Sequence, residues 1–344
     1  IVYDETIDSD NEQESSETSD ATIDVDDPLY SSQTNITSTN IDDVWDQYTT
    51  GDGSQVIAIL DTGVDYTHPD LEANIWINTE ELNGVEGYDD DGNGYIDDIR
   101  GWDFINIDNA PLDDNMHGTH VAGIAGAVGN NGIGIAGAAW NVKLMPLKVF
   151  QSTGQGNSVT ISDGIEYAYT NGATVINMSF ASPAESLTLR LTLENAYATS
   201  ILVAASGNSG MYIGPMLGLP FFPAAYSFVL GVEANALWSN YDNHPYYTEF
   251  SFLYNYELVA PGANIISTIP NGGYATLNGT SMAAPLVAGA LALYKELKPN
   301  ESKELMFGNI INTGEPYGSL GSTLFDLKAA IEVVPQPDLK ILTA

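Results

Sequence analysis

Five consecutive apolar residues, Val56 to Leu60, form a run of strand length that ends at Asp61. A strand with one face in water alternates apolar and polar residues, so this unbroken run predicts a strand buried on both faces. Such strands belong to parallel sheets that are covered by helices on both sides. The run therefore favours a layered α/β domain.

Strands and helices alternate along the rest of the chain. Further strands are predicted at Val142 to Val149, Ala173 to Ser179, Ile201 to Ala205 and Phe228 to Val232, and helices at His117 to Val128, Val159 to Thr170 and Ser186 to Ala198. This alternation predicts a three-layer α/β domain with a mainly parallel central sheet flanked by helices. A ligand site is expected beyond the carboxyl ends of the strands.

Helix signals mark both ends of this domain. Asn40 is expected to cap a short helix at its start. A long helix is predicted from Ser281 to Leu297, with Pro285 in its first turn, where a missing N–H is tolerated. A shorter helix around Leu324 to Val333 is expected to close the domain.

Composition divides the chain into three parts. Residues 1–38 are rich in Asp, Glu, Ser and Thr, and no Lys or Arg precedes Arg100, which predicts a solvated, flexible segment. The alternative is a propeptide remnant or a linker from one. The domain itself is expected to span residues 39–334. Residues 335–344 begin with Pro-Gln-Pro and are expected to form a tail or linker.

The charge balance excludes one class of partner. With 46 acidic and 9 basic residues, the net charge is −37, which argues against nucleic acid, because phosphate binding needs clustered Lys and Arg. An acidic chain instead suits cations, although the general alternative is a solubilising surface. No apolar run approaches the roughly 20 residues of a transmembrane helix.

Redox chemistry gives no information about compartment. The chain contains no cysteine, which removes disulfides, thiol nucleophiles and thiolate metal sites. The chain begins at Ile1, and we expect a trimmed product whose targeting segment has been removed.

Ser281 is a candidate nucleophile. It lies in Gly-Thr-Ser-Met-Ala-Ala-Pro, residues 279–285, at the junction of a turn and a helix. A serine hydroxyl is a poor nucleophile near neutral pH, so it requires a base, a group that orients the base and a site for the developing oxyanion. The free N–H groups of a helix N-terminus favour negative charge, so the Ser281 amide can supply half of that site.

Candidates for the orienting group, the base and the second oxyanion donor are found elsewhere in the chain. Asp61 follows the buried strand and is placed to orient a histidine, while His117 begins a helix of small residues that can pack tightly on a sheet. His120 is the competing base; the two histidines lack a third ligand at zinc-site spacing. Asn208 follows the apolar strand that ends at Ala205 and can donate to an oxyanion, the alternative being an ordinary turn residue.

A cation loop is predicted at residues 89–98, Asp-Asp-Asp-Gly-Asn-Gly-Tyr-Ile-Asp-Asp. Oxygen side chains at positions one, three and five, followed by glycine at six, match the opening of an EF-hand loop, although the glutamate at position twelve is missing. We assign the calcium ligands to Asp89, Asp91, Asn93, the carbonyl of Tyr95, and Asp98. An acidic surface turn is the alternative.

Over residues 39–334 the blocks around Asp61, His117 and Ser281, in this chain order, resemble those of the subtilisin-like serine proteases, or subtilases. The resemblance implies that Asp61 orients His117, that His117 takes the proton of Ser281, and that Asn208 helps to hold the oxyanion. It implies peptide-bond hydrolysis through an acyl-enzyme, with His120 structural. Leu286, where many members have histidine, is a departure that leaves the triad intact. The segment from Trp238 to Tyr256 is longer and more aromatic than is usual in the family.

The resemblance also implies a mode of substrate binding. Polypeptides would bind in extended form between two segments, Ser179-Phe180-Ala181 and Ala204-Ala205-Ser206, with a further edge around residues 155–156. Phe221 matches the floor of the S1 pocket, which predicts a shallow pocket for small or medium apolar side chains; packing in the core is the alternative. Asp70 and Asn131 match a second, structural calcium site of the family.

These observations predict a calcium-stabilised, secreted serine endopeptidase. It would be an extracellular or cell-surface monomer without a transmembrane segment, and a propeptide would be one of its partners. The rival from another class is a catalytically silent protein of the same fold that binds calcium or peptides. A dedicated processing protease with a single target is the narrower alternative.

Overall fold

The computed structural model describes residues 22–209, 212–213, 220–236, 241–242, 258–317 and 322–333. Its central sheet consists of β1 (Val56–Asp61), β2 (Trp102–Asp103), β3 (Lys143–Lys148), β4 (Val175–Met178), β5 (Ile201–Ala205), β7 (Leu230–Ala234), β9 (Leu258–Ala260), β12 (Glu315–Tyr317) and β13 (Ser322–Leu324). The order across the described sheet is β12-β13-β9-β7-β5-β4-β1-β3-β2. Neighbouring strands are parallel except for the pair β12 and β13. The predicted mainly parallel sheet is confirmed.

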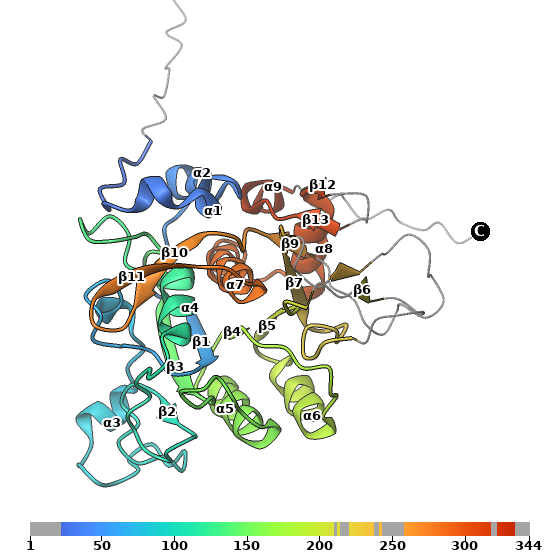
Figure 1. Cartoon of the computed structure of the whole chain (residues 1–344). Coiled ribbons are helices and arrows are strands. Elements are labelled where there is room, and N and C mark those ends of the chain that lie inside the picture. The colour runs from blue at the N-terminus through green and yellow to red at the C-terminus, as the bar shows by residue number, and fades with distance from the viewer. Residues whose placement is uncertain are drawn as a thin grey trace, which may run out of the picture.

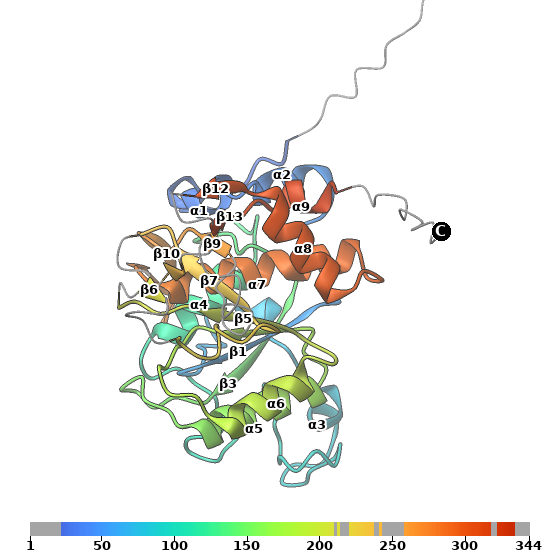
Figure 2. The same cartoon turned by 90° about the vertical axis from the view of Figure 1, so that its right-hand side faces the viewer.

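Helices cover both faces of the sheet, so the molecule has three layers (Figures 1 and 2). The α-helices are α1 (Thr34–Thr37), α2 (Ile41–Gln47), α3 (Thr79–Asn83), α4 (His117–Gly126), α5 (Ser158–Thr170), α6 (Leu187–Ala196), α7 (Thr280–Leu297), α8 (Lys303–Thr313) and α9 (Leu327–Ile331). The 3-10 helices are η1 (Tyr30–Ser32) and η2 (Glu72–Asn74). Helices α4 and α7 pack on one face of the sheet, and α5 and α6 lie on the other. The predicted helices are confirmed to within a few residues at their ends.

The two faces of β1 enter two separate hydrophobic cores. Ile57 and Ile59 pack with the residues of α4 and α7, whereas Ala58 and Leu60 pack with those of α5 and α6. All four side chains are fully buried. Because successive residues of a strand point to opposite faces, the unbroken apolar run is explained by these two cores.

Side-chain caps fix several helix starts. The Oδ1 atom of Asn157 accepts hydrogen bonds from the amides of Val159 and Thr160 at the start of α5. The prediction that Asn40 caps α2 is wrong: Asn40 has a left-handed backbone, with φ 53°, and its Nδ2 donates to Asp326 Oδ2 at 2.8 Å. The Asn40 side chain therefore bonds a residue 286 positions later instead of capping its own helix. This bond links the start of the domain to α9, because Asp326 is the N-cap residue of that helix.

Within the described residues, two smaller sheets accompany the central one. Strands β10 (Ile265–Ile269) and β11 (Gly273–Leu277) form an antiparallel hairpin, and β6 (Tyr212–Ile213) pairs in parallel with β8 (Tyr241–Asp242). The hairpin packs on α4, where the Ser267 hydroxyl donates to the carbonyl of His120 at 2.7 Å. Apart from β8, the aromatic segment from Trp238 to Tyr256 lies outside the described residues.

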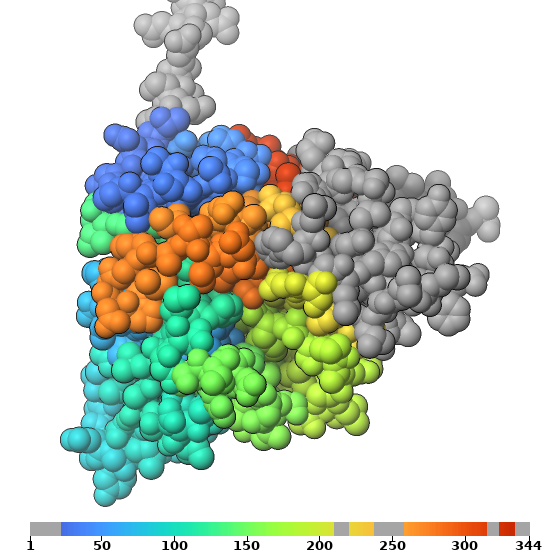
Figure 3. All heavy atoms as spheres, viewed as in Figure 1, coloured from blue at the N-terminus to red at the C-terminus, as the bar shows by residue number. Residues whose placement is uncertain are grey.

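The described part of the N-terminal segment packs against the domain. Ile36 is fully buried, and the amide of Leu29 donates to the carbonyl of Gly134 at 2.7 Å. Asp27 is buried as well. In Figure 3 these first described residues, in blue, lie beside the orange part of the surface that holds the hairpin. The expectation of a solvated segment is therefore wrong for residues 22–38, and residues 1–21 lie outside the described part.

The helices of the described residues also test the membrane prediction. None of them is long and apolar enough to cross a membrane.

Candidate active site

Asp61 and His117 form a hydrogen-bonded pair at the carboxyl end of the sheet. Asp61 is the last residue of β1 and His117 the first of α4. The Nδ1 atom of His117 lies 2.7 Å from Oδ1 and 2.9 Å from Oδ2 of Asp61. A carboxylate can only accept, so Nδ1 carries the proton and Nε2 of the neutral ring is left as the acceptor. This tautomer is the one that a general base requires.

Burial and two neighbouring carboxylates, Asp61 and Asp113, determine the pKa of the His117 imidazole. Burial disfavours the imidazolium and acts to lower the pKa of His117, but the Asp61 carboxylate and its hydrogen bond, together with Asp113, outweigh it and hold the pKa above 6.5. Asp61 as a whole residue is 2% exposed. Protonation of His117 therefore creates an ion pair with Asp61 in which the Asp61 side chain is 3% exposed and the His117 side chain is 30% exposed.

Gly118 permits this close approach. A Cβ at position 118 would lie 2.0 Å from the carbonyl oxygen of Gly63 and 2.9 Å from Cβ of Asp61. Any side chain would therefore push α4 away from the end of β1. The small residues at the start of α4 thus bring His117 into contact with Asp61, as the sequence predicted.

Thr62 and Asp113 form hydrogen bonds that hold Asp61 and the start of α4 in place. The Thr62 amide donates to Asp61 Oδ1 at 2.7 Å, and its hydroxyl donates to Asp113 Oδ1 at 2.8 Å. The same hydroxyl accepts the amide of Gly118 at 3.1 Å. Sequence reasoning missed both residues: Asp113 accepts the Thr119 amide in the first turn of α4 at 2.9 Å, but it lies three residues before the N-cap position, Met116, where a capping side chain is expected.

His120 is occupied elsewhere. Its side chain is fully buried, and Nε2 donates to the carbonyl of Ala275 in β11 at 3.0 Å. Burial lowers the pKa of His120 to about 4, so the ring is neutral at physiological pH. It tethers the hairpin to α4, which agrees with a structural role.

Ser281 lies in the first turn of α7 and exchanges two hydrogen bonds with Ser179. The Ser281 hydroxyl donates to the carbonyl of Ser179, and the Ser179 hydroxyl donates to the carbonyl of Ser281, each at 3.0 Å. Ser179 follows β4 directly. The Ser281 hydroxyl thus donates to Ser179 in this structure, and a hydrogen bond to Nε2 of His117 would require it to rotate. Catalytic hydrogen bonds often form only when substrate binds.

Asn208 is held with its amide nitrogen toward Ser281. Its Oδ1 accepts hydrogen bonds from the amide and the hydroxyl of Thr280, at 2.9 and 3.1 Å. Because the oxygen is occupied, the NH2 group is the free end. A methyl group on Gly279 would lie 3.5 Å from both Asn208 Nδ2 and the Ser281 amide nitrogen, so these two donors border one small space.

Known proteins of one family are similar to this chain. The family model described as the subtilase family matches residues 52–326. The chain belongs to the subtilase family. It is 37% identical over 263 residues to Subtilisin-like protease 1 of Plasmodium falciparum (isolate 3D7), covering 72% of this chain and 38% of that protein. It is 39% identical over 250 residues to Thermophilic serine proteinase of Bacillus sp. (strain AK1), covering 72% and 54%. Subtilisin Savinase of Lederbergia lenta is 37% identical over 286 residues, covering 82% and 91%. The matched region therefore spans 38% of the length of the first of these relatives and 54% of the length of the second.

The cleft of this subtilase lies beside His117. A cavity of about 190 Å³ is lined by Asp61, Thr62, Asn115, His117, Phe150, Gly154, Ser179 and Phe180. The rings of Phe150 and Phe180 meet edge to face, with centroids 5.0 Å apart. An apolar wall of this kind next to polar groups is typical of a site that binds a substrate side chain.

The other predicted substrate residues are less accessible. Ala204, Ala205 and Ser206 are buried at the end of β5, between β4 and β7. Phe221 is 8% exposed and belongs to the core shared with α5 and α6. Residues 214–219, close to it in the chain, lie outside the described part, so the pocket floor stays a prediction. Ala181, after Phe180, is only partly buried.

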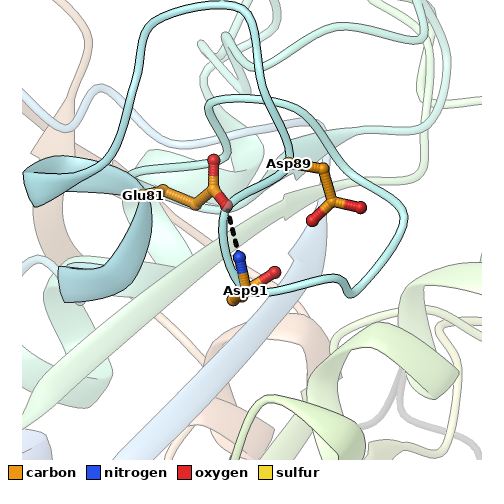
Figure 4. A group of neighbouring side chains, drawn as sticks. All are labelled: Glu81, Asp89 and Asp91. Atoms are coloured by element: carbon orange, nitrogen blue, oxygen red, sulfur yellow. Dashed lines mark hydrogen bonds between the residues drawn. The ribbon is translucent and has the colours of Figure 1, made fainter.

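Three carboxylates form a cluster at the predicted cation loop, two of them from the loop itself. Oxygen atoms of Glu81, Asp89 and Asp91 lie within 4.8 Å of one another (Figure 4). Glu81 comes from α3 and is 4% exposed; its Oε1 accepts the amides of Asp90 and Asp91, at 2.6 and 3.1 Å. Glu81 was missed because it precedes the EF-hand-like run. Three carboxylates so close together are the hard oxygen ligands that calcium prefers.

The other predicted ligands of the loop face inward. Asp98 is fully buried, accepts from Nδ2 of both Asn78 and Asn93, at 3.0 and 2.9 Å, and contacts the Tyr167 hydroxyl. Burial raises the pKa of Asp98 despite these hydrogen bonds. The ring of Tyr95 packs edge to face on three aromatic rings, among them Tyr167 at 5.0 Å. These residues anchor the loop to α5.

The residues of the second predicted calcium site also meet. The Asp70 carboxylate is fully buried and accepts from Asn131 Nδ2 at 2.9 Å, from the Ile135 amide at 3.0 Å and from the Tyr274 hydroxyl at 3.1 Å. The pKa of Asp70 is raised by burial. Asp27 lies at the same loop and accepts the amides of Asn130 and Asn131. Protein donors thus occupy both oxygens of Asp70, and calcium here stays a prediction.

Proposed function

We propose that this subtilase is a serine endopeptidase in which Asp61, His117 and Ser281 form the catalytic triad. The observation that carries the proposal is the hydrogen-bonded pair of Asp61 and His117 Nδ1, at 2.7 and 2.9 Å, beside the cleft that Ser179 also lines. The pair fixes the tautomer of His117, and Ser179 holds the backbone of the nucleophile.

The residues have distinct roles in the reaction. Nε2 of His117 accepts the proton of Ser281 as Oγ attacks the scissile carbonyl carbon, and the imidazolium formed is stabilised by Asp61. The carbonyl oxygen becomes an oxyanion that accepts hydrogen bonds from Asn208 Nδ2 and the Ser281 amide. His117 then returns the proton to the leaving amine. Water then takes the place of the amine: His117 accepts a proton from water as the water oxygen attacks the acyl carbon, and returns the proton to Ser281 Oγ as the ester C–O bond breaks.

The substrate is proposed to be a polypeptide in extended form. It would lie along Ser179, Phe180 and Ala181 on one side and the end of β5 on the other, with backbone hydrogen bonds supplying affinity. A shallow S1 pocket that takes small or medium apolar side chains is part of the proposal and rests on the family resemblance, since Phe221 itself is 8% exposed and packs in the core. Cleavage profiling with peptide libraries tests this, and a strong preference for large aromatic P1 residues would contradict it.

Calcium is proposed to bind the carboxylates of Glu81, Asp89 and Asp91. It would supply positive charge to three carboxylates whose oxygen atoms lie within 4.8 Å of one another. Asp98, Asn93 and Tyr95 would hold the loop in shape. Asp70 and Asn131 remain the candidates for a second ion.

The cellular setting is proposed to be extracellular, with the protein secreted as a monomer after removal of a propeptide. The calcium loop supports this, because extracellular calcium is abundant enough to fill sites of modest affinity. Fractionation of the producing cells and sizing of the protein in solution test both parts. A cell-internal or oligomeric protein would overturn them.

A serine-directed fluorophosphonate tests the proposed activity. The wild-type protein should be labelled at Ser281, and both labelling and casein hydrolysis should be lost in Ser281→Ala, with the fold checked by circular dichroism. Ser162→Ala, a buried serine on α5, is the matched control and should keep labelling. Absence of labelling in the folded wild type would favour the silent, peptide-binding alternative.

A further inference from the structure

Lys148 is a buried cation directly beside the proposed catalytic aspartate. It is the last residue of β3, pairs in register with Asp61 of β1, and its side chain is 1% exposed. A buried ammonium is costly unless it is paired and hydrogen-bonded. The position of this charge therefore calls for an explanation from its contacts.

The ammonium of Lys148 makes two short contacts that lead in different directions. It donates to the carbonyl oxygen of Thr62 and to Oδ1 of Asp114, each at 2.6 Å. Thr62 is the residue whose amide donates to Asp61 Oδ1. Asp114 lies in the short loop that leads into His117, and its side chain is 52% exposed.

Lys148 thus contacts both Thr62, whose amide bonds Asp61, and Asp114, in the loop that leads into His117. The Thr62 contact is buried, whereas the Asp114 contact is partly buried, because the lysine is enclosed and the Asp114 side chain is 52% exposed. The chain has a second link between the same parts, because Asp113 joins Thr62 to the start of α4. Lys148 is therefore needed chiefly for the turn at Thr62.

We propose that Lys148 is a positioning residue for Asp61 and His117, which acts by holding the Thr62 carbonyl. The inference rests on the proposed triad. Without the ammonium, the peptide after Thr62 would be free to rotate, and the hydrogen bond from the Thr62 amide to Asp61 would shift with it. Asp61 would then orient His117 less well, while the substrate cleft would be unchanged.

Two single variants separate positioning from simple charge pairing. Lys148→Met removes both contacts with little change in shape, and Asp114→Asn keeps the Thr62 contact while it removes the exposed charge. We expect Lys148→Met to lower kcat about 10- to 100-fold, the scale of a misplacement near 1 Å, with KM within about twofold. Asp114→Asn should retain kcat within about threefold, because the Thr62 contact is kept, the asparagine oxygen can still accept from the ammonium, and the carboxylate that is removed is 52% exposed.

The double variant tests the rival explanation. If Lys148 served only to neutralise Asp114, Lys148→Met with Asp114→Asn would recover kcat; we expect it to stay as low as Lys148→Met. The rate of fluorophosphonate labelling per folded molecule should fall in parallel with kcat, since it reports the triad without a bound peptide. Equal labelling rates in all folded variants would overturn the proposal.

Three further outcomes bear on the proposal. If neither Lys148→Met nor Lys148→Gln yields folded protein, Lys148 is a residue of the core and the proposal fails. Failure of the proposed function is distinguishable, because then the folded wild type itself would not be labelled. Partial recovery of the labelling rate in Lys148→Gln, whose amide can still donate to Thr62, would support the proposal.

Discussion

Asn208 Oδ1 accepts both the amide and the hydroxyl hydrogens of Thr280, at 2.9 and 3.1 Å, and this fixes which end of the Asn208 amide faces Ser281. The Thr280 hydroxyl in turn accepts the amide of Gly207 at 3.1 Å. The donor of the proposed oxyanion site is thus oriented before any substrate arrives. Preorganised donors of this kind act on the transition state more than on the ground state.

The first prediction concerns the Asn208 donor. Asn208→Asp keeps the acceptor for Thr280 but replaces the NH2 group by an oxygen, so it cannot donate to an oxyanion. We expect kcat to fall by about 10²- to 10³-fold or more with little change in KM. Steady-state kinetics on a peptide anilide checks this. A rise in KM at constant kcat would mean that Asn208 binds the ground state instead.

The second prediction uses the space between the two donors. In Gly279→Ala the new methyl group would lie 3.5 Å from both Asn208 Nδ2 and the Ser281 amide, where the oxyanion is proposed to sit. The backbone at Gly279, with φ 164°, suits any residue, so the variant should fold. We expect a loss of kcat of at least about 10-fold with a melting temperature close to that of the wild type.

A matched control for this substitution is Gly308→Ala in the middle of α8. There a methyl group would meet nothing closer than 4.0 Å, and helix propensity favours alanine by about 1 kcal/mol. We expect unchanged kcat and slightly higher thermal stability. If both glycine variants had the same kcat as the wild type, the proposed position of the oxyanion would be wrong.

The sequence predicted most of the fold because the relevant signals are local. The apolar run of β1 reports burial on both faces, and each helix that flanks the sheet carries its own apolar pattern. The errors came from long-range partners. Asn40 was expected to cap a helix but bonds Asp326, and Ile36 is buried in a core cluster whose members extend to Ile331.

The candidate site shows the same division. Asp61, His117 and Asn208 were identified because each stands at the boundary of a strand or helix. Glu81, Thr62 and Lys148 were not, since their roles depend on contacts that no motif encodes. Glu81 joins the cation loop from a separate helix, and Lys148 reads in sequence as an ordinary end of a strand.

The third prediction concerns pH. Catalysis needs neutral His117, and the pKa of His117 is raised above 6.5 because Asp61 and Asp113 outweigh the effect of burial. The acid limb of kcat/KM, which reports the free enzyme, should therefore have its midpoint above pH 6.5. Protonated His117 stabilises the fold fully below the unfolded pKa of about 6.5, and this contribution is lost as the pH rises through the folded value.

Asp61→Asn is the variant that checks this assignment. Removal of the carboxylate should move the acid limb to lower pH and reduce kcat by about 10⁴-fold, because the tautomer of His117 is no longer fixed. The rate of fluorophosphonate labelling as a function of pH measures both effects. An acid limb that stayed in place would mean that another group controls it.

The last prediction concerns the cation loop. If calcium binds Glu81, Asp89 and Asp91, a chelator should lower the melting temperature, and calcium in excess should restore it. Binding at about 100 times the dissociation constant corresponds to about 2.7 kcal/mol of stability. Glu81→Gln should weaken the response to calcium, because it removes one of the three charges that a single ion would neutralise. Glu80→Gln, an exposed neighbour on the same helix, should respond to calcium as the wild type does. Equal calcium responses in the two variants would show that the stabilising ion lies elsewhere, with Asp70 and Asn131 as the next residues to test.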